Sequence, residues 1–256
     1  MNLVFVVDIG NTNIVLGIFL PDKLVASWRL STHTIKTVDE YEIMTRSFLS
    51  LAKVNPSGIK GAIIASVVPN ATQILQAMIR RLFGTEPLVV GAGIKTGIPI
   101  KTDNPREVGA DRIANTVAAY ELYGGPAIVV DFGTATTFDV ISSQGEYLGG
   151  QISPGINISM EALFQKAAKL PRVALKKPAS AIGKNTVTSM QAGIYYSVIG
   201  GIQFAIQAIR DDLGCSAKAI ATGGLAEVVG PHVKIFDVIN GDLTLEGLRI
   251  IYNRNK

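Results

Sequence analysis

Two short stretches of the sequence place a carboxylate just before a turn of small and hydroxyl-bearing residues. Asp8 precedes Gly10-Asn11-Thr12-Asn13, and Asp131 precedes Phe132-Gly133-Thr134. Such turns bring backbone N–H groups close to phosphate oxygens, and a carboxylate at a strand end can hold magnesium, directly or through water. One turn alone would more simply be an ordinary hairpin. Two in equivalent places favour a pair of phosphate-binding elements.

The same pattern of predicted elements surrounds both turns. LVFVVDIGNTNIVLGIFLPDKLVASWRL predicts a strand, a tight turn, a second strand, a turn at Pro21-Asp22 and a third strand, and residues 127–151 repeat this order. An internal repeat of this kind predicts two similar lobes, 1–123 and 124–256, in an α/β protein. We expect each lobe to be a mixed sheet flanked by helices, with a nucleotide cleft between the lobes.

Helical periodicity appears at Asp39–Ala52 and Ala71–Phe83, on either side of an apolar strand at 61–68. A third helix is expected over Thr186–Leu213, with Gly214 in a left-handed C-terminal cap. This third helix is apolar beyond one stripe. Burial within its lobe and a role in a subunit interface are both open for it.

Phosphoryl transfer to an alcohol needs a group that orients the hydroxyl and accepts its proton. Asp111 could be that acceptor, although the pattern alone favours a simpler role as the N-cap of a helix over Arg112–Tyr123. The planar guanidinium of Arg112 suits a carboxylate ligand, and an exposed first-turn position is its alternative. For Thr186 the alternative is a helix cap.

Composition restricts the class of protein. The chain has 256 residues, 48% hydrophobic and 17% charged, which is typical of a globular α/β enzyme. Cys215 is the single cysteine and there are two histidines, so neither an intrachain disulfide nor an ordinary zinc site can form. We therefore expect a cytoplasmic protein. Glutamines interrupt the longest apolar segment, so no membrane anchor is expected.

The charge and the absence of common motifs bear on which ligands and partners the protein can have. The net charge is +4, and one stretch, Lys166–Lys184, holds six basic residues and no acidic one. It is either a solvated surface or a region that draws anions toward a cleft. No G-x-x-x-x-G-K-[ST] loop occurs, and Gly91–Gly97 misses the dinucleotide spacing by one residue. Neither a basic recognition helix nor a zinc-finger pattern is present, so no nucleic-acid partner is expected.

DIGNTN, DFGTATT and Thr222-Gly223-Gly224 resemble the two phosphate motifs and the adenosine motif of the actin-like, sugar-kinase and heat-shock chaperone ATPase superfamily. The resemblance implies an actin-like, ribonuclease H-like fold for each lobe. Four further segments resemble, in order and spacing, type III pantothenate kinases over essentially the whole chain. These segments are Asn104–Arg112, Gly149–Gly155, Gly183–Thr186 and Leu243–Leu248.

This resemblance implies ATP-dependent phosphorylation of pantothenate, the first step of coenzyme A biosynthesis, by a homodimer. Asp111 would then be the general base, and Asp131 would hold a monovalent cation, potassium or ammonium. Magnesium would accompany ATP, with Asp8 as its carboxylate. The implied substrate-binding residues are Gly109, Ala110, Asp111, Arg112 and Thr186, the last from the same or the opposite subunit. The implied ATP-binding residues are Asp8, Ile9, Gly10, Asn11, Thr12, Asn13, Ile14, Val15 and Thr134.

One departure concerns the segment before Asn104. Many family members have a tyrosine where this chain has Thr102, which puts one substrate-lining contact in doubt. Two other interpretations stay open. One is a kinase of the same superfamily that acts on a sugar or another small alcohol. The other is a nucleotide-binding accessory factor without catalysis, which the retained Asp8, Asp111 and Asp131 argue against.

Overall fold

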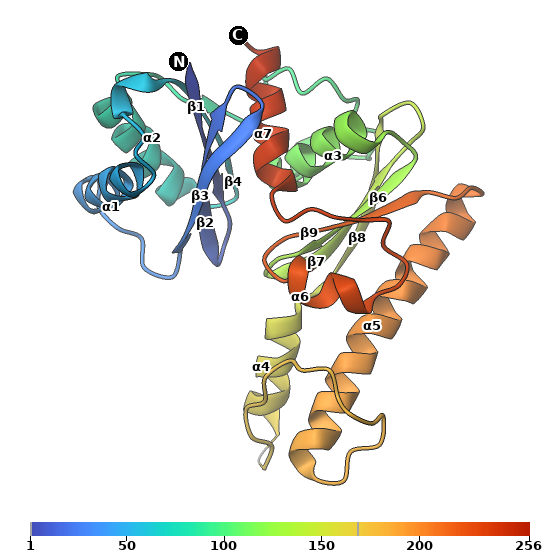
Figure 1. Cartoon of the computed structure of the whole chain (residues 1–256). Coiled ribbons are helices and arrows are strands. Elements are labelled where there is room, and N and C mark those ends of the chain that lie inside the picture. The colour runs from blue at the N-terminus through green and yellow to red at the C-terminus, as the bar shows by residue number, and fades with distance from the viewer. Residues whose placement is uncertain (1, 168) are drawn as a thin grey trace. The chain divides into compact units, whose positions relative to one another are not determined.

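The computed structural model describes residues 2–167 and 169–256 (Figure 1). The chain forms two compact units. The first contains the residues up to Tyr123 together with Asp242–Lys256, and the second is Gly124–Gly241. The expected second lobe, 124–256, therefore differs from the structure at its end, because the last helix packs on the first unit.

The first unit is built on a five-stranded mixed sheet in the order β3-β2-β1-β4-β5. Strand β1 pairs antiparallel with β2 and parallel with β4, as a hairpin followed by a helical crossover requires. The strands are β1 Leu3–Ile9, β2 Asn13–Leu20, β3 Lys23–Ser31, β4 Ile59–Ser66 and β5 Leu88–Val89.

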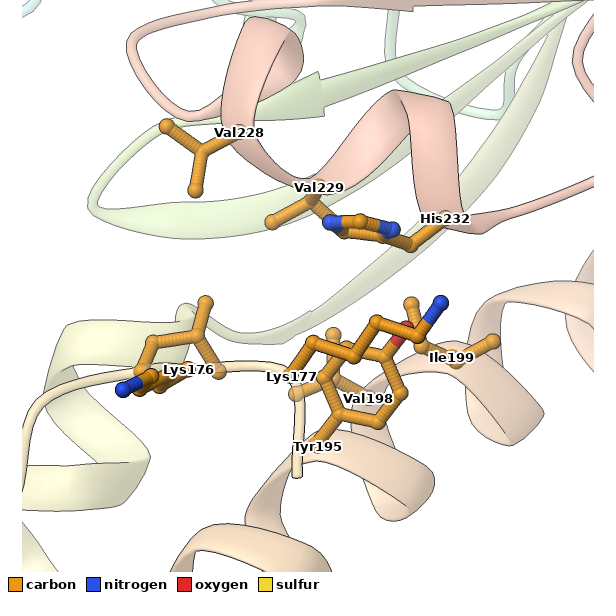
Figure 2. A pocket seen from close by; sticks show the side chains of 9 residues that line it. Lys176, Lys177, Tyr195, Val198, Ile199, Val228, Val229 and His232 are labelled. Atoms are coloured by element: carbon orange, nitrogen blue, oxygen red, sulfur yellow. The ribbon is translucent and has the colours of Figure 1, made fainter. Parts of the chain in front are cut away.

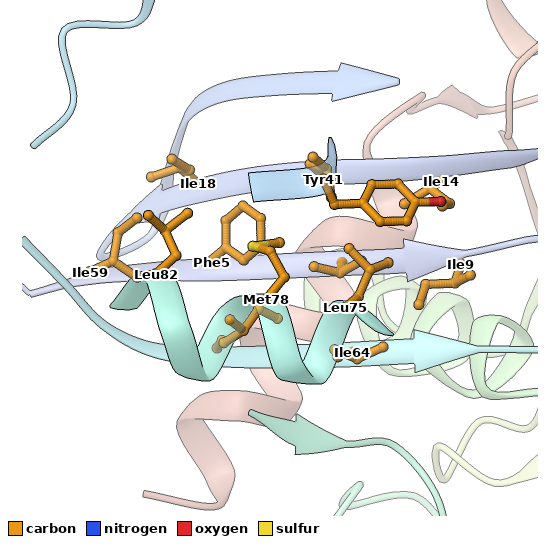
Figure 3. Packing of buried hydrophobic residues seen from close by; sticks show 14 of the residues in the cluster. Phe5, Ile9, Ile14, Ile18, Tyr41, Ile59, Ile64, Leu75, Met78 and Leu82 are labelled. Atoms are coloured by element: carbon orange, nitrogen blue, oxygen red, sulfur yellow. The ribbon is translucent and has the colours of Figure 1, made fainter. Parts of the chain in front are cut away.

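Helices α1 (Val38–Leu51) and α2 (Pro69–Phe83) confirm the two predicted in this region. Helix α1 starts at a capping box in which the Glu40 amide donates to Thr37 Oγ1 at 3.3 Å and the Thr37 amide donates to Glu40 Oε2 at 2.8 Å. Both helices cover one face of the sheet, where their side chains pack on alternate residues of β1 (Figure 3). This is the main core of the first unit.

The opposite face of the same sheet is covered by α7 (Leu243–Arg254), which packs against β1, β4 and α3 (Ala110–Tyr123). Two glycines in the sheet make room for it. A Cβ added at Gly17 would lie 3.0 Å from Leu245 Cδ1, and one added at Gly61 would lie 1.6 Å from the Tyr252 hydroxyl. These contacts explain why the last helix belongs to the first unit.

The second unit repeats the first sheet, with strands in the order β10-β9-β6-β7-β8. Again the first strand pairs antiparallel with the second and parallel with the fourth. The elements are β6 Ala127–Phe132, β7 Ala135–Ile141, β8 Tyr147–Pro154, α4 Ile156–Lys166, α5 Thr186–Leu213, β9 Lys218–Thr222, α6 Ala226–Val229 and β10 Val238–Ile239. The matching strand orders confirm the predicted repeat of an α/β lobe. Three short 3-10 turns, Pro56–Gly58, Pro105–Glu107 and Gly230–His232, complete the chain.

Helix α5 has the predicted extent, and Gly214 ends it at φ 63° in the left-handed conformation expected for that cap. By length and composition, α5 is also apolar enough to cross a membrane, contrary to what its interrupting glutamines led us to expect. Only 28% of its most apolar stretch is buried. Figure 1 shows α4 and the first half of α5 extending beyond the sheet of their own unit. The exposed apolar surface of α5 therefore needs an explanation.

Candidate functional site

The first turn, between β1 and β2, is closed by its own backbone and held by one residue from outside it. The Gly10 amide donates to the Asn13 carbonyl at 2.9 Å. Thr32, directly after β3, donates from its amide to the Thr12 carbonyl and from its hydroxyl to the Gly10 carbonyl, each at 2.9 Å. Because Thr32 is only 7% exposed, these bonds are shielded from water. Asn11 and Asn13 at the tip stay exposed.

The second turn, between β6 and β7, is closed in the same way, with the Gly133 amide donating to the Ala135 carbonyl at 3.1 Å. Its support differs. Gly155, directly after β8, lies so close that an added Cβ would be 2.1 Å from the Thr134 carbonyl oxygen. The residue after the third strand thus supports both turns, through a hydroxyl in one unit and a glycine in the other. Sequence reasoning missed Thr32. It included Gly155 in the segment Gly149–Gly155 but did not foresee its contact with the second turn.

Asp8 and Asp131 occupy equivalent places in the two sheets. Asp8 is registered beside Ala65 of the parallel neighbour β4, and Asp131 is registered beside Thr222 of the parallel neighbour β9. Both carboxylates are partly buried. The repeat therefore sets one carboxylate beside each glycine-containing turn, at the carboxyl end of the first strand of each sheet.

The surroundings of Asp131 fit a monovalent cation, which binds through oxygen atoms that replace its hydration shell. Thr222 is fully buried, and its Oγ1 has no hydrogen-bond partner in the described part of the chain. A Cβ added at Gly223 would lie 2.2 Å from Asp131 Oδ1, and Gly223 has φ 92°. The structure therefore has a carboxylate beside an unpaired hydroxyl, and the backbone at Gly223 has room for no side chain.

A site built from clustered protein ligands is not found. Within residues 2–167 and 169–256, no group of three or more His, Cys, Asp and Glu side chains could hold a metal ion. Magnesium commonly binds through one or two carboxylates, several waters and the substrate's phosphates. A single carboxylate such as Asp8 is compatible with that mode.

Asp111 lies in the first turn of α3, one residue inside the helix. The N-cap role predicted as its alternative is wrong, because the helix begins at Ala110 and the Ile113 amide bonds back to the Gly109 carbonyl at 3.0 Å. Asp111 Oδ1 accepts a 2.9 Å bond from the Arg112 amide. A Cβ added at Gly109 would lie 2.4 Å from Asp111 Oδ1, so the carboxylate keeps this position only because residue 109 is a glycine. Asp111 and Arg112 are both partly buried.

Helix α7 fixes the helix that carries Asp111. The Thr244 hydroxyl of α7 donates at 2.7 Å to Oδ1 of Asn115, which is fully buried in α3. A Cβ added at Gly247 would lie 1.9 Å from the Ala114 carbonyl oxygen, so the two helices touch backbone to backbone there. These contacts explain why the Leu243–Leu248 segment has a threonine and a glycine where α7 packs on α3. The sequence alone offered no sign that this segment lies behind α3.

The segment before α3 has its own local order. In the turn Pro105–Glu107, Asn104 Nδ2 donates to Glu107 Oε1 at 2.6 Å, and the Arg106 amide donates to Asn104 Oδ1 at 3.3 Å. Thr102, the departure from the family pattern, has a buried Oγ1 with no partner among the residues that the structure describes. The threonine therefore leaves a polar atom unsatisfied there.

Thr186 is the first residue of α5 and is exposed. The cap role proposed as its alternative is wrong, because Asn185 is the N-cap and accepts a 3.0 Å bond from the Thr188 amide. Thr186 belongs to the second unit, whereas Asp111 and Arg112 belong to the first.

Two hollows lie in the second unit. The smaller is bounded by Lys177, Tyr195, Val229 and His232, and Figure 2 shows their side chains around it. Its volume is about 40 Å³, which is room for a few water molecules and is small for a nucleotide base. The larger is a groove of about 810 Å³ along β7, β8, α4 and α5, lined mainly by apolar side chains such as Phe138, Leu163 and Ile202.

Comparisons with known proteins are consistent with these features. The family model described as type III pantothenate kinase matches residues 4–208. A type III pantothenate kinase of Moorella thermoacetica is 55% identical over 253 residues, which is 99% of this chain and 100% of that protein.

Solved structures share the fold at low identity. A conserved protein of the Baf transcriptional-activator family from Campylobacter jejuni has a TM-score of 0.61 at 19% identity, covering 98% of both chains. A protein designated a sugar kinase, from Cytophaga hutchinsonii, has a TM-score of 0.50 at 14% identity, covering 98% of this chain and 100% of its own. These likenesses confirm the actin-like, two-lobed α/β fold.

Proposed function

The chain belongs to the type III pantothenate kinase family, and from that premise we propose how its residues divide the work of phosphoryl transfer. The protein is a kinase that phosphorylates pantothenate to 4'-phosphopantothenate with ATP, in coenzyme A biosynthesis. One observation carries the assignment of residues. The same carboxylate and glycine-containing turn occur at the same edge of two sheets with the same strand order.

Both turns bind ATP. In the first, backbone N–H groups and short side chains of residues 8–15 receive phosphate oxygens, and the support from Thr32 holds the turn in shape before ATP arrives. In the second, the exposed Thr134 contacts ATP. Preorganised donors of this kind stabilise charge that develops on the transferred phosphoryl group.

Two cations assist. The Asp8 carboxylate would hold magnesium together with the ATP phosphates, and the ion would supply the charge neutralisation that phosphoryl transfer needs. Asp131 holds a monovalent cation, potassium or ammonium. The unpaired Thr222 hydroxyl and the close approach of Gly223 support a cation at Asp131.

Pantothenate lies against the start of α3. Gly109, Ala110, Asp111 and Arg112 bind it, and the Arg112 guanidinium takes its carboxylate. Asp111 orients the primary hydroxyl and accepts its proton as the hydroxyl oxygen bonds to the γ-phosphorus and the bond from that phosphorus to the β,γ-bridging oxygen breaks. The Asn115–Thr244 bond and the contact at Gly247 hold α3, and so Asp111, in place.

The active form is a homodimer in which α5 packs on its counterpart. Phe204 on α5 and Ile152 on β8 are 78% and 68% exposed, and α5 and β8 border the apolar groove of about 810 Å³. A large exposed apolar surface marks an interaction site. Burial in a dimer explains the exposed apolar surface of α5 without a membrane or a nucleic acid as its partner. We propose that the protein acts in the cytoplasm. The Phe204→Glu variant should be monomeric by light scattering.

Thr186 contacts pantothenate from the opposite subunit. Mixed dimers test this, because one subunit carrying Asp111→Asn and another carrying Thr186→Ala would together rebuild one intact site. Random exchange of subunits should restore roughly a quarter of the wild-type turnover. No recovery in mixed dimers would place Thr186 and Asp111 in the same subunit's site.

The reaction itself is tested with purified protein, ATP and magnesium by following ADP release and phosphopantothenate formation. Pantothenate should support turnover, and potassium or ammonium should raise it above the rate in sodium. The control substrates are glucose, glycerol and N-acetylmannosamine. Rapid turnover of one of these without turnover of pantothenate would reject the proposed substrate.

A further inference from the structure

Thr222 has a hydroxyl whose burial the fold does not explain. It is 0% exposed at the carboxyl end of β9, and its Oγ1 has no hydrogen-bond partner within the described residues. A buried hydroxyl without a partner costs about 1–3 kcal/mol, so such groups are rare unless a ligand, ion or water pairs with them. Valine would fill the same volume without that cost.

The hydroxyl lies beside Asp131. In parallel strands, registered residues point to the same face of the sheet, and Asp131 is registered with Thr222. The alternate residues of β9, Ala219 and Ala221, face the apolar core with α5, so Thr222 faces the other way. One carboxylate and one hydroxyl therefore share a face at the strand ends.

The internal repeat supplies a comparison. The position equivalent to Thr222 in the first sheet is Ala65, which is registered with Asp8. Alanine has no polar side-chain atom, so the hydroxyl is found only in the lobe of Asp131. The two sheets have the same strand order, so the shared topology alone does not account for the hydroxyl.

Gly223 completes the arrangement. It has φ 92°, and an added Cβ would be 2.2 Å from Asp131 Oδ1 and 2.7 Å from the Phe132 amide nitrogen. Any side chain there would displace the carboxylate from its place. The backbone is therefore shaped to let Asp131 turn toward the end of β9.

We propose that the Thr222 hydroxyl oxygen is a ligand of the monovalent cation held by Asp131. This inference rests on the proposed cation role of Asp131. One carboxylate and one neutral oxygen balance a single positive charge. Potassium can be coordinated by such oxygen atoms, and ammonium can donate hydrogen bonds to them. Magnesium demands near-octahedral geometry and usually keeps several waters, whereas Thr222 is fully buried.

Thermal unfolding of the full protein tests this without any turnover. Potassium chloride replaces tetramethylammonium chloride at constant ionic strength, with and without magnesium and a non-hydrolysable ATP analogue. A cation that binds only the folded state stabilises it by RT ln(1 + c/Kd), where c is the concentration of the cation and Kd is its dissociation constant. In wild type, Tm should therefore start to rise when potassium reaches its Kd and should then increase with the logarithm of the potassium concentration.

Three variants distinguish a ligand from a packing residue. Thr222→Val should unfold at or above the wild-type Tm without potassium, yet need roughly tenfold more potassium for the same rise in Tm, as expected when one ligand is lost. Thr222→Ser should keep the wild-type potassium dependence. Thr45→Val is the matched control, because Thr45 is another buried threonine with an unpaired Oγ1, far from the turns in the sequence. It should follow wild type.

Two results would overturn the inference in distinguishable ways. If Thr222→Val shows the wild-type potassium dependence, Thr222 is not a ligand, and the role of Asp131 is unaffected. If wild type shows no potassium shift in either arm, the cation site at Asp131 is wrong and this inference falls with it. Turnover of pantothenate is measured in a separate assay, so neither result changes the test of the proposed function.

Discussion

The Thr32 hydroxyl donates a 2.9 Å hydrogen bond to the Gly10 carbonyl, across 22 residues of sequence. This bond ties the end of β3 to the turn between β1 and β2. Because the Gly10 carbonyl is engaged by Thr32, the backbone N–H groups of the turn are held in one orientation. The turn is thereby prepared for an anion before the anion binds, which is the arrangement that favours catalysis by fixed dipoles.

Replacing Thr32 by valine should loosen this turn while keeping the side-chain volume. Losing one net hydrogen bond of about 1 kcal/mol corresponds to a KM for ATP raised about fivefold, with a smaller change in the KM for pantothenate. Steady-state kinetics with each substrate varied in turn would measure this. Thr32→Ser retains the hydroxyl and should stay near wild type. Equal changes in both KM values would mean that Thr32 supports the fold and not the turn.

The second turn should be sensitive to Gly155 for a different reason. In Gly155→Ala the new methyl group would lie 2.1 Å from the Thr134 carbonyl oxygen, so the turn must move. We expect kcat/KM for ATP to fall at least about tenfold, since small displacements of positioning groups are costly. Gly150→Ala, at an exposed place on β8, is the control and should have little effect. Wild-type kinetics in Gly155→Ala would show that the turn does not contact ATP.

Asp111→Asn removes the proposed proton acceptor but keeps its size. Loss of a general base lowers kcat by about 10²–10⁴-fold. The rise in Tm on adding ATP and magnesium should persist, because the proposed role of Asp111 is at pantothenate and not at ATP. The exposed neighbour Asp103, changed to asparagine, should retain at least about half of the activity, as surface substitutions usually do. A kcat within twofold of wild type in Asp111→Asn would remove this residue as the base.

The contact between α3 and α7 should appear in stability. In Gly247→Ala the added Cβ would meet the Ala114 carbonyl oxygen at 1.9 Å, and such overpacking costs about 1–3 kcal/mol of unfolding free energy. Asn253→Ala, exposed in the same helix, controls for helix propensity and should be neutral or slightly stabilising. Urea unfolding of both variants gives the comparison. If Gly247→Ala were as stable as wild type, α7 would have to pack differently.

Acid should weaken the contact between α1 and α2. Glu42 on α1 accepts hydrogen bonds from Arg46 and from Arg81 of α2, and these bonds, Arg46 first, lower the pKa of its carboxyl below the ordinary 4.5. A lowered pKa contributes stability above the unfolded-state value that is lost as pH falls through the folded-state value. Glu42→Gln should therefore be less stable than wild type at pH 7. The difference should begin to shrink near pH 4.5 and should vanish once the pH is below the lowered pKa of Glu42. A constant difference from pH 7 to pH 3 would contradict this.

Local patterns predicted most of the elements. The ends of α5 and the cap at Gly214 were visible because apolar periodicity and a glycine report directly on backbone geometry. The N-cap role given as the alternative for Asp111 was wrong because the helix begins at Ala110, two residues before Arg112. Gly109 leaves room for the Asp111 carboxylate at that start. The motifs also predicted which residues handle phosphate, and that assignment stays a prediction.

The supports of the site could not be predicted in the same way. Thr32, Gly155, Thr222 and Gly247 matter because of contacts or burial created by distant parts of the chain, and single-sequence periodicity carries no distance information. The internal repeat was the one long-range signal available. It predicted two equivalent turns, but it could not show that a hydroxyl supports one and a glycine supports the other.

Helix α7 also sets the order in which the protein can be completed during synthesis. The face of the first sheet that it covers belongs to β1 and β4, which leave the ribosome before the second unit, while α7 leaves after it. Domains usually fold as units and N-terminal first. Here the first unit must wait, with Gly17 and Gly61 uncovered, until the whole second unit has been translated. Nascent chains halted before residue 242 should be more susceptible to proteases in the first unit than the finished protein.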